Sequence, residues 1–297
     1  FKIENKYILF FVFTILFVSI LIFKSHDDFI YYHFPYSYYL TQNKMFFGIG
    51  HFGHGFRTHS SIFYLNSLFY LPIIKYYLFN LSAILIMGFS NIIFLERIYK
   101  NIKKNNINFV TFFTLLSFLF VNIFFYRIGE HGSDRSAQIL LFLMVSEILI
   151  LINFKKEIIN TLSKIYIIIS IIISLKAFYI LHIAFFIPII IFLIKKYSIS
   201  KIVKIIIINN SFYLFALTFF LVLATYFFST GCLIYPVSQT CFDNFIWSIN
   251  IPEVKKYSDW YELWAKGGAA PNFGVSNPDE YILGFNWVKN WSDIYFF

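Results

Sequence analysis

Two adjacent carboxylates follow the first long apolar stretch of the chain. That stretch runs from Tyr7 to Phe23, and Lys24-Ser25-His26 separates it from Asp27 and Asp28. A carboxylate in this position can act as a general base for an acceptor hydroxyl, or it can bind a metal ion. The pair can equally be a solvated helix end. Asp27 and Asp28 are therefore candidate catalytic residues, with the structural alternative open.

Histidine is concentrated in the same part of the chain, where five of the seven lie: His26, His33, His51, His54 and His59. His51 and His54 are three residues apart, but the glycines around them disfavour a helix that would pair them. No cysteine joins them, and zinc requires a defined ligand set. We predict no metal ligand set and no cofactor, with a divalent metal at the acidic segments as the alternative. His33 is a candidate substrate-binding residue.

A second charged cluster lies about 100 residues further on, in the sequence Arg127-Ile-Gly-Glu-His-Gly-Ser-Asp-Arg135. Arginine suits bidentate binding of phosphate, and glycine lets the backbone approach a ligand closely. The alternative is a hydrophilic turn held by two internal salt bridges. The candidate binding residues here are Glu130, His131, Asp134 and Arg135.

The segments between these clusters are apolar enough to cross a membrane. Hydrophobic residues make up 59% of the chain and charged residues 13%, whereas a soluble domain is nearer half and a quarter. A helix needs about 20 mostly apolar residues to span the hydrocarbon core. Because lipid offers no hydrogen bonds to the backbone, such segments must be helices. The clear candidates are Tyr7–Phe23, Ile73–Leu95, Phe109–Tyr126, Ala137–Phe154 and Ile205–Phe228.

The stretch from Ile165 to Ile194 is too long for one span and short for two. Lysines flank it on both sides, which predicts that the chain enters the membrane and returns on the same side. We expect a hairpin of two short helices that turns near Lys176 to His182. Lys176 at its tip would reach an anionic ligand. The sequence therefore predicts an all-α, polytopic transmembrane bundle of about seven spans.

The distribution of lysine and arginine predicts the orientation. Most of them lie in short loops between apolar runs, which is typical of cytoplasmic loops and argues against a nucleic-acid partner despite a net charge of +9. We expect a cytoplasmic start and a transmembrane domain over residues 1–228, with outward loops at 24–72 and 127–136. In a bacterium the protein would lie in the inner membrane, with these loops in the periplasm.

Residues 229–297 form an outward segment that holds all five tryptophans and leads into a further span. Cys232 and Cys241 are the only cysteines, and both would face an oxidising compartment, so we predict a disulfide between them. The chain begins at Phe1 and stops within an apolar run, and we expect it to be part of a longer protein.

This layout resembles the GT-C superfamily of polytopic glycosyltransferases, which includes the protein mannosyltransferase-like and lipid A aminoarabinose transferase-like families. In those enzymes an acidic pair follows the first helix, as Asp27-Asp28 does here, although their pair is often Asp-Glu. Phe29–Lys44 resembles their amphipathic membrane-surface helix, with a kink at Pro35. Ser60–Leu71 resembles the helix that leads into the second span, and the turn at 129–134 resembles their second acidic loop.

The resemblance implies transfer of a sugar from a polyprenyl-phosphate carrier to an acceptor at the outer membrane face, with the carrier-linked donor and membrane lipid as partners. Asp27 or Asp28 would deprotonate the acceptor. Glu130 or Asp134 would orient the acceptor or assist a metal. The candidates for holding the leaving phosphate are Arg57, Arg127, Arg135 and Lys176.

Two other functions fit the same sequence. An O-antigen polymerase or similar polysaccharide-assembly protein would also be polytopic with arginine-rich outward loops, but it needs no acidic pair after the first helix. A transporter would carry polar residues inside the membrane and internal repeats. The candidates for such polar residues are Glu147 and Lys176, and the sequence has no clear internal repeat.

Overall fold

The computed structural model describes residues 6–21, 28–125, 132–154, 157–270 and 273–295. The chain divides into two compact units. Unit 1 comprises residues 1–45 and 53–225, and unit 2 comprises residues 46–52 and 226–297. Within the described residues the elements are helical, apart from one short antiparallel hairpin in unit 2.

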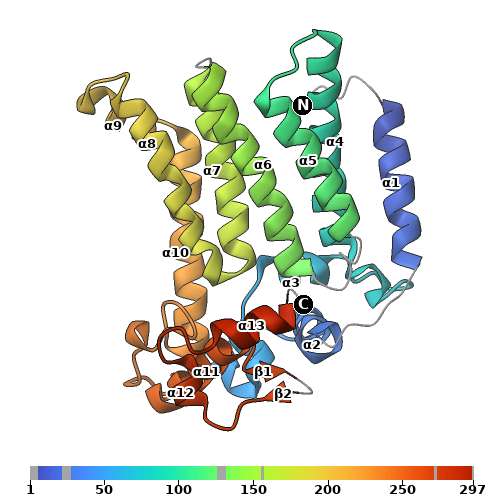
Figure 1. The fold of residues 1–297 in the computed structure, drawn as a ribbon. Helices are drawn as coiled ribbons and strands as arrows, with labels where there is room; N and C mark the ends of the chain where they lie inside the picture. Colours follow the sequence, from blue (N-terminus) through green and yellow to red (C-terminus); the bar gives the residue numbers. More distant parts are fainter. Residues whose placement is uncertain (1–5, 22–27, 126–131, 155–156, 271–272, 296–297) are drawn as a thin grey trace. The chain divides into compact units, whose positions relative to one another are not determined.

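Unit 1 is built around long apolar helices that run between two ends of a bundle (Figure 1). The helices are α1 (Lys6–Leu21), α4 (Leu81–Lys103), α5 (Phe109–Phe124), α6 (Gly132–Phe154), α7 (Ile158–Leu175), α8 (Phe186–Ile194) and α10 (Asn210–Thr230), the last of which ends in unit 2. A short helix, α9 (Ile199–Ile207), lies at one end of the bundle (Figure 1). Within the described part of the chain, five helical stretches are long and apolar enough to cross a membrane: 76–103, 132–153, 158–175, 177–194 and 210–230. The prediction of an all-α membrane protein is confirmed at this level.

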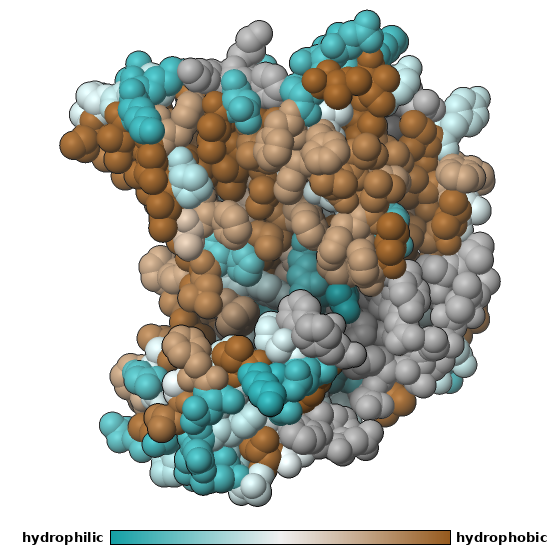
Figure 2. Space-filling model, in the orientation of Figure 1, coloured by the Kyte–Doolittle hydropathy of each residue, from teal (hydrophilic) through white to brown (hydrophobic). Residues whose placement is uncertain are grey.

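The core of unit 1 lies between helices that are apolar on every side. On α7, Ile165, Ile169 and Ile172 are completely buried, while Ile167 and Ile171 are about two-fifths exposed. The buried set recurs every three or four residues, which places it on one helical face. Figure 2 shows apolar side chains covering the visible face of the long helices and hydrophilic ones at the ends. Lipid is the solvent that suits such exposed isoleucines.

Two charged side chains pair inside this bundle. Arg97 of α4 forms an ion pair with Glu147 of α6, and its other terminal nitrogen donates to Ser146 Oγ at 2.7 Å. Ser146 lies 3.3 Å from Thr114 Oγ1 of α5, so the network ties three helices together. The pair of Arg97 and Glu147 therefore has a structural role in the bundle.

The second predicted span is displaced along the chain. The sequence suggested Ile73–Leu95, but α4 begins at Leu81 and continues to Lys103. Leu71 and Lys75 form an antiparallel bridge, and Lys75 has a φ of 54°, so the chain turns here and cannot be helical. A 3₁₀ turn, η4 (Tyr76–Leu78), follows. Residues 73–80 are mostly apolar, but they form this turn and not the start of the helix.

Other boundaries also differ from expectation. The helix predicted from Ala137 begins at Gly132, and the span predicted from Ile205 is divided into α9 and α10. The division lies at Asn209, whose side-chain oxygen accepts from the backbone N–H of Ser211 at 3.0 Å and so caps α10.

The helix break predicted near Lys176 is present. Helix α7 ends at Leu175, and Lys176 has extended backbone angles of −163° and 135°. The chain then continues as a 3₁₀ segment, η5 (Ala177–Phe185), before α8 carries it back along the bundle (Figure 1). The part of the prediction that extended the turn to His182 is wrong, because that residue lies within η5.

Unit 2 combines short elements with the last turn of α10. They are η2 (Ile49–Phe52), η6 (Ser238–Thr240), α11 (Ile251–Ala265), the hairpin β1 (Ala269–Ala270) and β2 (Phe273–Gly274), α12 (Pro278–Ile282) and α13 (Val288–Tyr295). Phe47 stacks on Phe228 at 4.8 Å between ring centroids. A Cβ on Gly50 would lie 2.8 Å from the carbonyl oxygen of Ser229. The glycine-rich sequence thus lets residues 46–52 pack closely against the end of α10.

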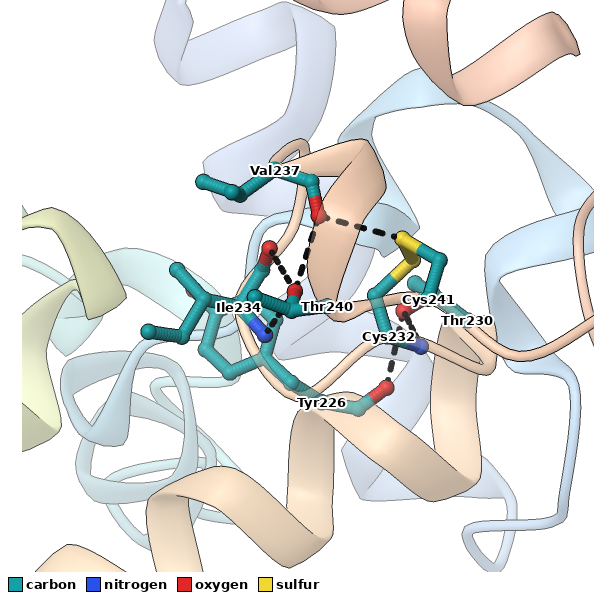
Figure 3. The surroundings of a disulfide bond; sticks show 7 residues. All are labelled: Tyr226, Thr230, Cys232, Ile234, Val237, Thr240 and Cys241. Atoms are coloured by element: carbon teal, nitrogen blue, oxygen red, sulfur yellow. Dashed lines mark hydrogen bonds between the residues drawn. A yellow bond between two sulfur atoms is a disulfide. The ribbon is translucent and has the colours of Figure 1, made fainter. Parts of the chain in front are cut away.

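A disulfide closes a loop of unit 2 (Figure 3). Cys232 and Cys241 are joined with an S–S distance of 2.09 Å. Between them, Thr240 Oγ1 donates to the carbonyl oxygen of Val237 at 2.8 Å and accepts from the backbone N–H of Ile234 at 3.1 Å. The covalent link and the threonine therefore hold the same short loop.

Candidate functional site

The first outward segment forms short helices at the end of unit 1 where α4, α6 and α8 begin. They are the π-helical turn η1 (Phe29–His33), α2 (Phe34–Gln42), the 3₁₀ turn η3 (His54–Arg57) and α3 (Ser61–Leu68). The segment that resembles a membrane-surface helix is thus helical from Phe29 to Gln42, with Pro35 in the first turn of α2. Asp28 immediately precedes η1 and is partly exposed. Asp27 lies outside the described residues.

A buried polar core holds these short helices together. Tyr36 is completely buried, and its hydroxyl lies 2.5 Å from Nδ1 of His59. The rings of Tyr36 and His33 both pack on Phe63, at 5.1 and 5.3 Å between centroids. The candidate residues His33 and Arg57 are each only 6% exposed. Direct contact of either side chain with a substrate would require the surrounding helices to move.

Burial also decides which of these groups carry charge. It lowers the pKa of His59 to about 3, and burial together with the nearby Arg57 lowers the pKa of His54. Both imidazoles are therefore neutral near pH 7 and cannot hold a phosphate by charge. Arg57 by contrast remains a cation, because a guanidinium stays protonated.

The second predicted cluster is partly helical. Asp134 and Arg135 were expected in a loop, but they lie in the first turn of α6, where a carboxylate is favoured by the helix dipole. Because the residues around this helix start are polar, their average hydropathy does not indicate that the helix begins here. Arg127, Glu130 and His131 lie outside the described residues.

Asp134 is paired with the lysine at the break after α7. Lys176 Nζ lies 3.0 and 2.9 Å from the two carboxylate oxygens, and the hydroxyl of Tyr179 donates to one of them at 3.2 Å. The two charged side chains are 36% and 38% exposed, so solvent and a ligand can both reach them. Arg135 lies with its guanidinium carbon 4.7 Å from the centre of the Phe125 ring. Two cations and a carboxylate therefore lie around the start of α6.

Helix α3 links the two clusters. Ser61 Oγ lies 2.8 Å from Ser174 Oγ, two residues before Lys176. A Cβ on Gly132 would lie 3.2 Å from the side chain of Ile62. The end of α7 and the start of the second acidic segment therefore lie against this short helix of the first segment.

A small cavity lies where these elements meet. Its polar lining residues are His33, Asn66 and Asn80, and Phe29 and Gly132 also face it. The side-chain oxygen of Asn66 is buried there without a hydrogen-bond partner. The cavity volume is about 10 Å³, which is the space of about one water molecule. Residues of both segments line this cavity, but it is too small to hold a sugar.

Sequence reasoning missed Tyr36, Tyr179 and Asn66, since single tyrosines and an asparagine in an aromatic-rich chain carry no distinctive pattern. Within the described ranges, no group of three histidine, cysteine, aspartate or glutamate residues is placed to hold a metal ion.

The fold and the charged cluster define a helical membrane protein with polar groups gathered at one end of its bundle. The chain belongs to the family described as a domain of unknown function, DUF8201, whose profile matches residues 1–295. No curated protein and no solved structure matches the chain.

Proposed function

We propose that this protein is a membrane glycosyltransferase of the GT-C type that moves a sugar from a polyprenyl-phosphate carrier to an acceptor. The observation that carries the proposal is the meeting of the two acidic segments. Phe29, next to Asp28, and Gly132, two residues before Asp134, line the same small cavity. Two loops separated by about 100 residues supply carboxylates and cations to one end of the bundle, as such a transfer requires.

In the proposed reaction Asp27 or Asp28 deprotonates the acceptor hydroxyl, which then attacks the anomeric carbon of the carrier-linked sugar. The bond from that carbon to the phosphate oxygen breaks, and the carrier phosphate leaves with its negative charge. Arg135 and Lys176, which are partly exposed, would stabilise it, and the buried Arg57 and Arg127, which lies outside the described residues, are further candidates. Asp134 orients Lys176 through the ion pair.

The proposal includes a topology. Seven spans would be formed by α1, α4, α5, α6, α7, the η5–α8 segment and α10, with the lysine-rich turns after α4 and α8 in the cytoplasm. The acidic end would then face the outer side of a membrane, which in a bacterium is the periplasmic side of the inner membrane.

The test is replacement of Asp27 and Asp28 singly by asparagine. Full-length protein in membrane vesicles would be supplied with radiolabelled polyprenyl-phosphate-linked sugars, and loss of label from the lipid phase would be measured. Loss of a general base should lower transfer about 10²- to 10⁴-fold in one of the two variants. Asp259→Asn, which removes an exposed carboxylate from α11, is the matched control. Undiminished transfer by both variants refutes the catalytic assignment and favours the polymerase alternative.

A further inference from the structure

The surface of helix α9 has three faces of different character. Ile202 is 6% exposed and packs with Ile205 and Ile206 on the core of unit 1. A second row of apolar residues recurs every four positions and remains exposed, and the third face carries lysine. The exposed apolar row is Ile199 at 77%, Val203 at 47% and Ile207 at 42%, and the charged face holds Lys201 and Lys204. One face thus contacts protein, one is apolar without protein cover, and one is cationic.

The position of α9 is fixed at the end of the bundle. Asn209, which follows the helix, donates to the carbonyl oxygen of Ile159 at 3.2 Å and accepts from Ser163 Oγ at 2.9 Å. Both partners lie in the first two turns of α7. In Figure 1, α9 lies at the same end as the turn between α4 and α5. This is the level at which the candidate spans end.

Among the described residues, the lysines on and next to α9 form no ion pair. Lys195 and Lys196 end α8, so four exposed lysines lie within ten residues. No acidic residue occurs between Glu157 and Asp243. Tyr197 lies between the two pairs, with Lys196 Nζ at 5.3 Å and Lys201 Nζ at 4.8 Å from its ring centre. An aromatic ring among lysines is typical of the headgroup level of a membrane.

We propose that α9 lies in the membrane surface and that its lysines bind anionic phospholipid headgroups. The row of Ile199, Val203 and Ile207 enters the acyl boundary, while Lys201 and Lys204 extend their ammonium groups to the phosphates. The charge of the four lysines is complementary to that of an anionic leaflet. The inference does not depend on the proposed transferase activity.

The depth of the helix is tested with a fluorophore attached to a single added cysteine, because both native cysteines are in the disulfide. Val203→Cys and Lys201→Cys point about 160° apart around the helix. The full chain would be reconstituted in vesicles of phosphatidylglycerol and phosphatidylcholine, with a doxyl quencher on the lipid chains. Quenching should be strong at position 203 and weak at position 201. Equal quenching at both positions overturns the proposal.

The lipid preference is tested by placing the quencher on phosphatidylglycerol or on phosphatidylcholine. Each lysine near an anionic surface is worth about a fivefold preference, so Lys201→Gln/Lys204→Gln, which removes two, should lower the selectivity for phosphatidylglycerol by up to about 25-fold. Lys201→Arg/Lys204→Arg should retain it, which separates charge from folding. Lys255→Gln/Lys256→Gln on α11 removes the same charge elsewhere and should have no effect. Selectivity that survives loss of Lys201 and Lys204 overturns the headgroup assignment.

Discussion

Replacement of Glu147 by glutamine keeps the shape of the side chain but removes the charge that faces Arg97. The Glu147 side chain is 3% exposed and that of Arg97 is 18% exposed, so water screens this ion pair poorly. Removal of one partner of a buried pair leaves an uncompensated charge and costs about 3–5 kcal/mol. We expect a value near the lower end for Glu147→Gln, because the amide oxygen can still accept from Arg97.

Removal of both charges should cost much less. In Arg97→Met/Glu147→Met no charge is left in the apolar interior, and Ser146 retains Thr114 as a hydrogen-bond partner at 3.3 Å. Replacement of whole buried pairs by apolar residues is often neutral or stabilising. The two single substitutions should therefore be strongly non-additive, with a coupling energy of about 2 kcal/mol or more.

The assay is thermal unfolding of the purified chain in detergent, followed by far-ultraviolet circular dichroism. At about 2 °C per kcal/mol, Glu147→Gln should lower the midpoint by roughly 6 °C. The matched control is Glu262→Gln, which breaks the exposed pair with Lys266 in α11 and should cost about 0.5 kcal/mol. A midpoint change no larger than in this control, or additive losses in the double variant, would refute the assignment of a buried structural pair.

Three further predictions concern unit 1 and unit 2. Because burial lowers the pKa of His59 to about 3, the unfolded chain binds the proton more strongly; stability should be full above about pH 6.5 and fall by about 2 kcal/mol by pH 5, and His59→Asn should flatten this slope in unfolding measured against pH. Gly55→Ala places a Cβ 2.3 Å from a side chain of η1 and should cost about 1–3 kcal/mol in chemical denaturation, whereas Gly274→Ala, which meets nothing within 4 Å, should be near neutral. Cys232→Ser/Cys241→Ser opens a loop closed over a separation of 9 residues and should cost about 2.5 kcal/mol, measured as faster proteolysis of unit 2; unchanged proteolysis would contradict this.

Hydropathy predicted the presence of most helices better than their ends. Isoleucine occupies both the completely buried position 169 and the exposed position 167 of α7. Since lipid and protein core are both apolar, no polar stripe marks which face is which. Helix ends were set instead by local backbone features, such as the positive φ of Lys75 and the cap by Asn209. Neither feature changes the hydropathy averaged along the sequence, so hydropathy does not indicate where these helices begin.

The residue types of the candidate site could be predicted from the sequence, but their arrangement in space could be predicted only in part. Lys176 was identified because a lysine within an apolar stretch is costly and needs a partner. That its partner is Asp134 depends on the close packing of α6 and α7, which the sequence alone does not show. His33 was expected to contact substrate, but it is buried against Phe63. Burial of a histidine depends on the short helices that surround it, and composition does not report this.

The polar groups inside the bundle bear on the transporter alternative. Asn91 of α4 and Asn122 of α5 exchange two amide hydrogen bonds, each of 3.0 Å. Near the other end of the same helix pair, Asn101 donates to Thr111 Oγ1 at 2.9 Å. These side chains satisfy one another across packed helices, which is how polar residues hold membrane helices together. A transport path would instead direct such groups toward a water-filled space. The polar side chains between α4 and α5 therefore serve helix packing.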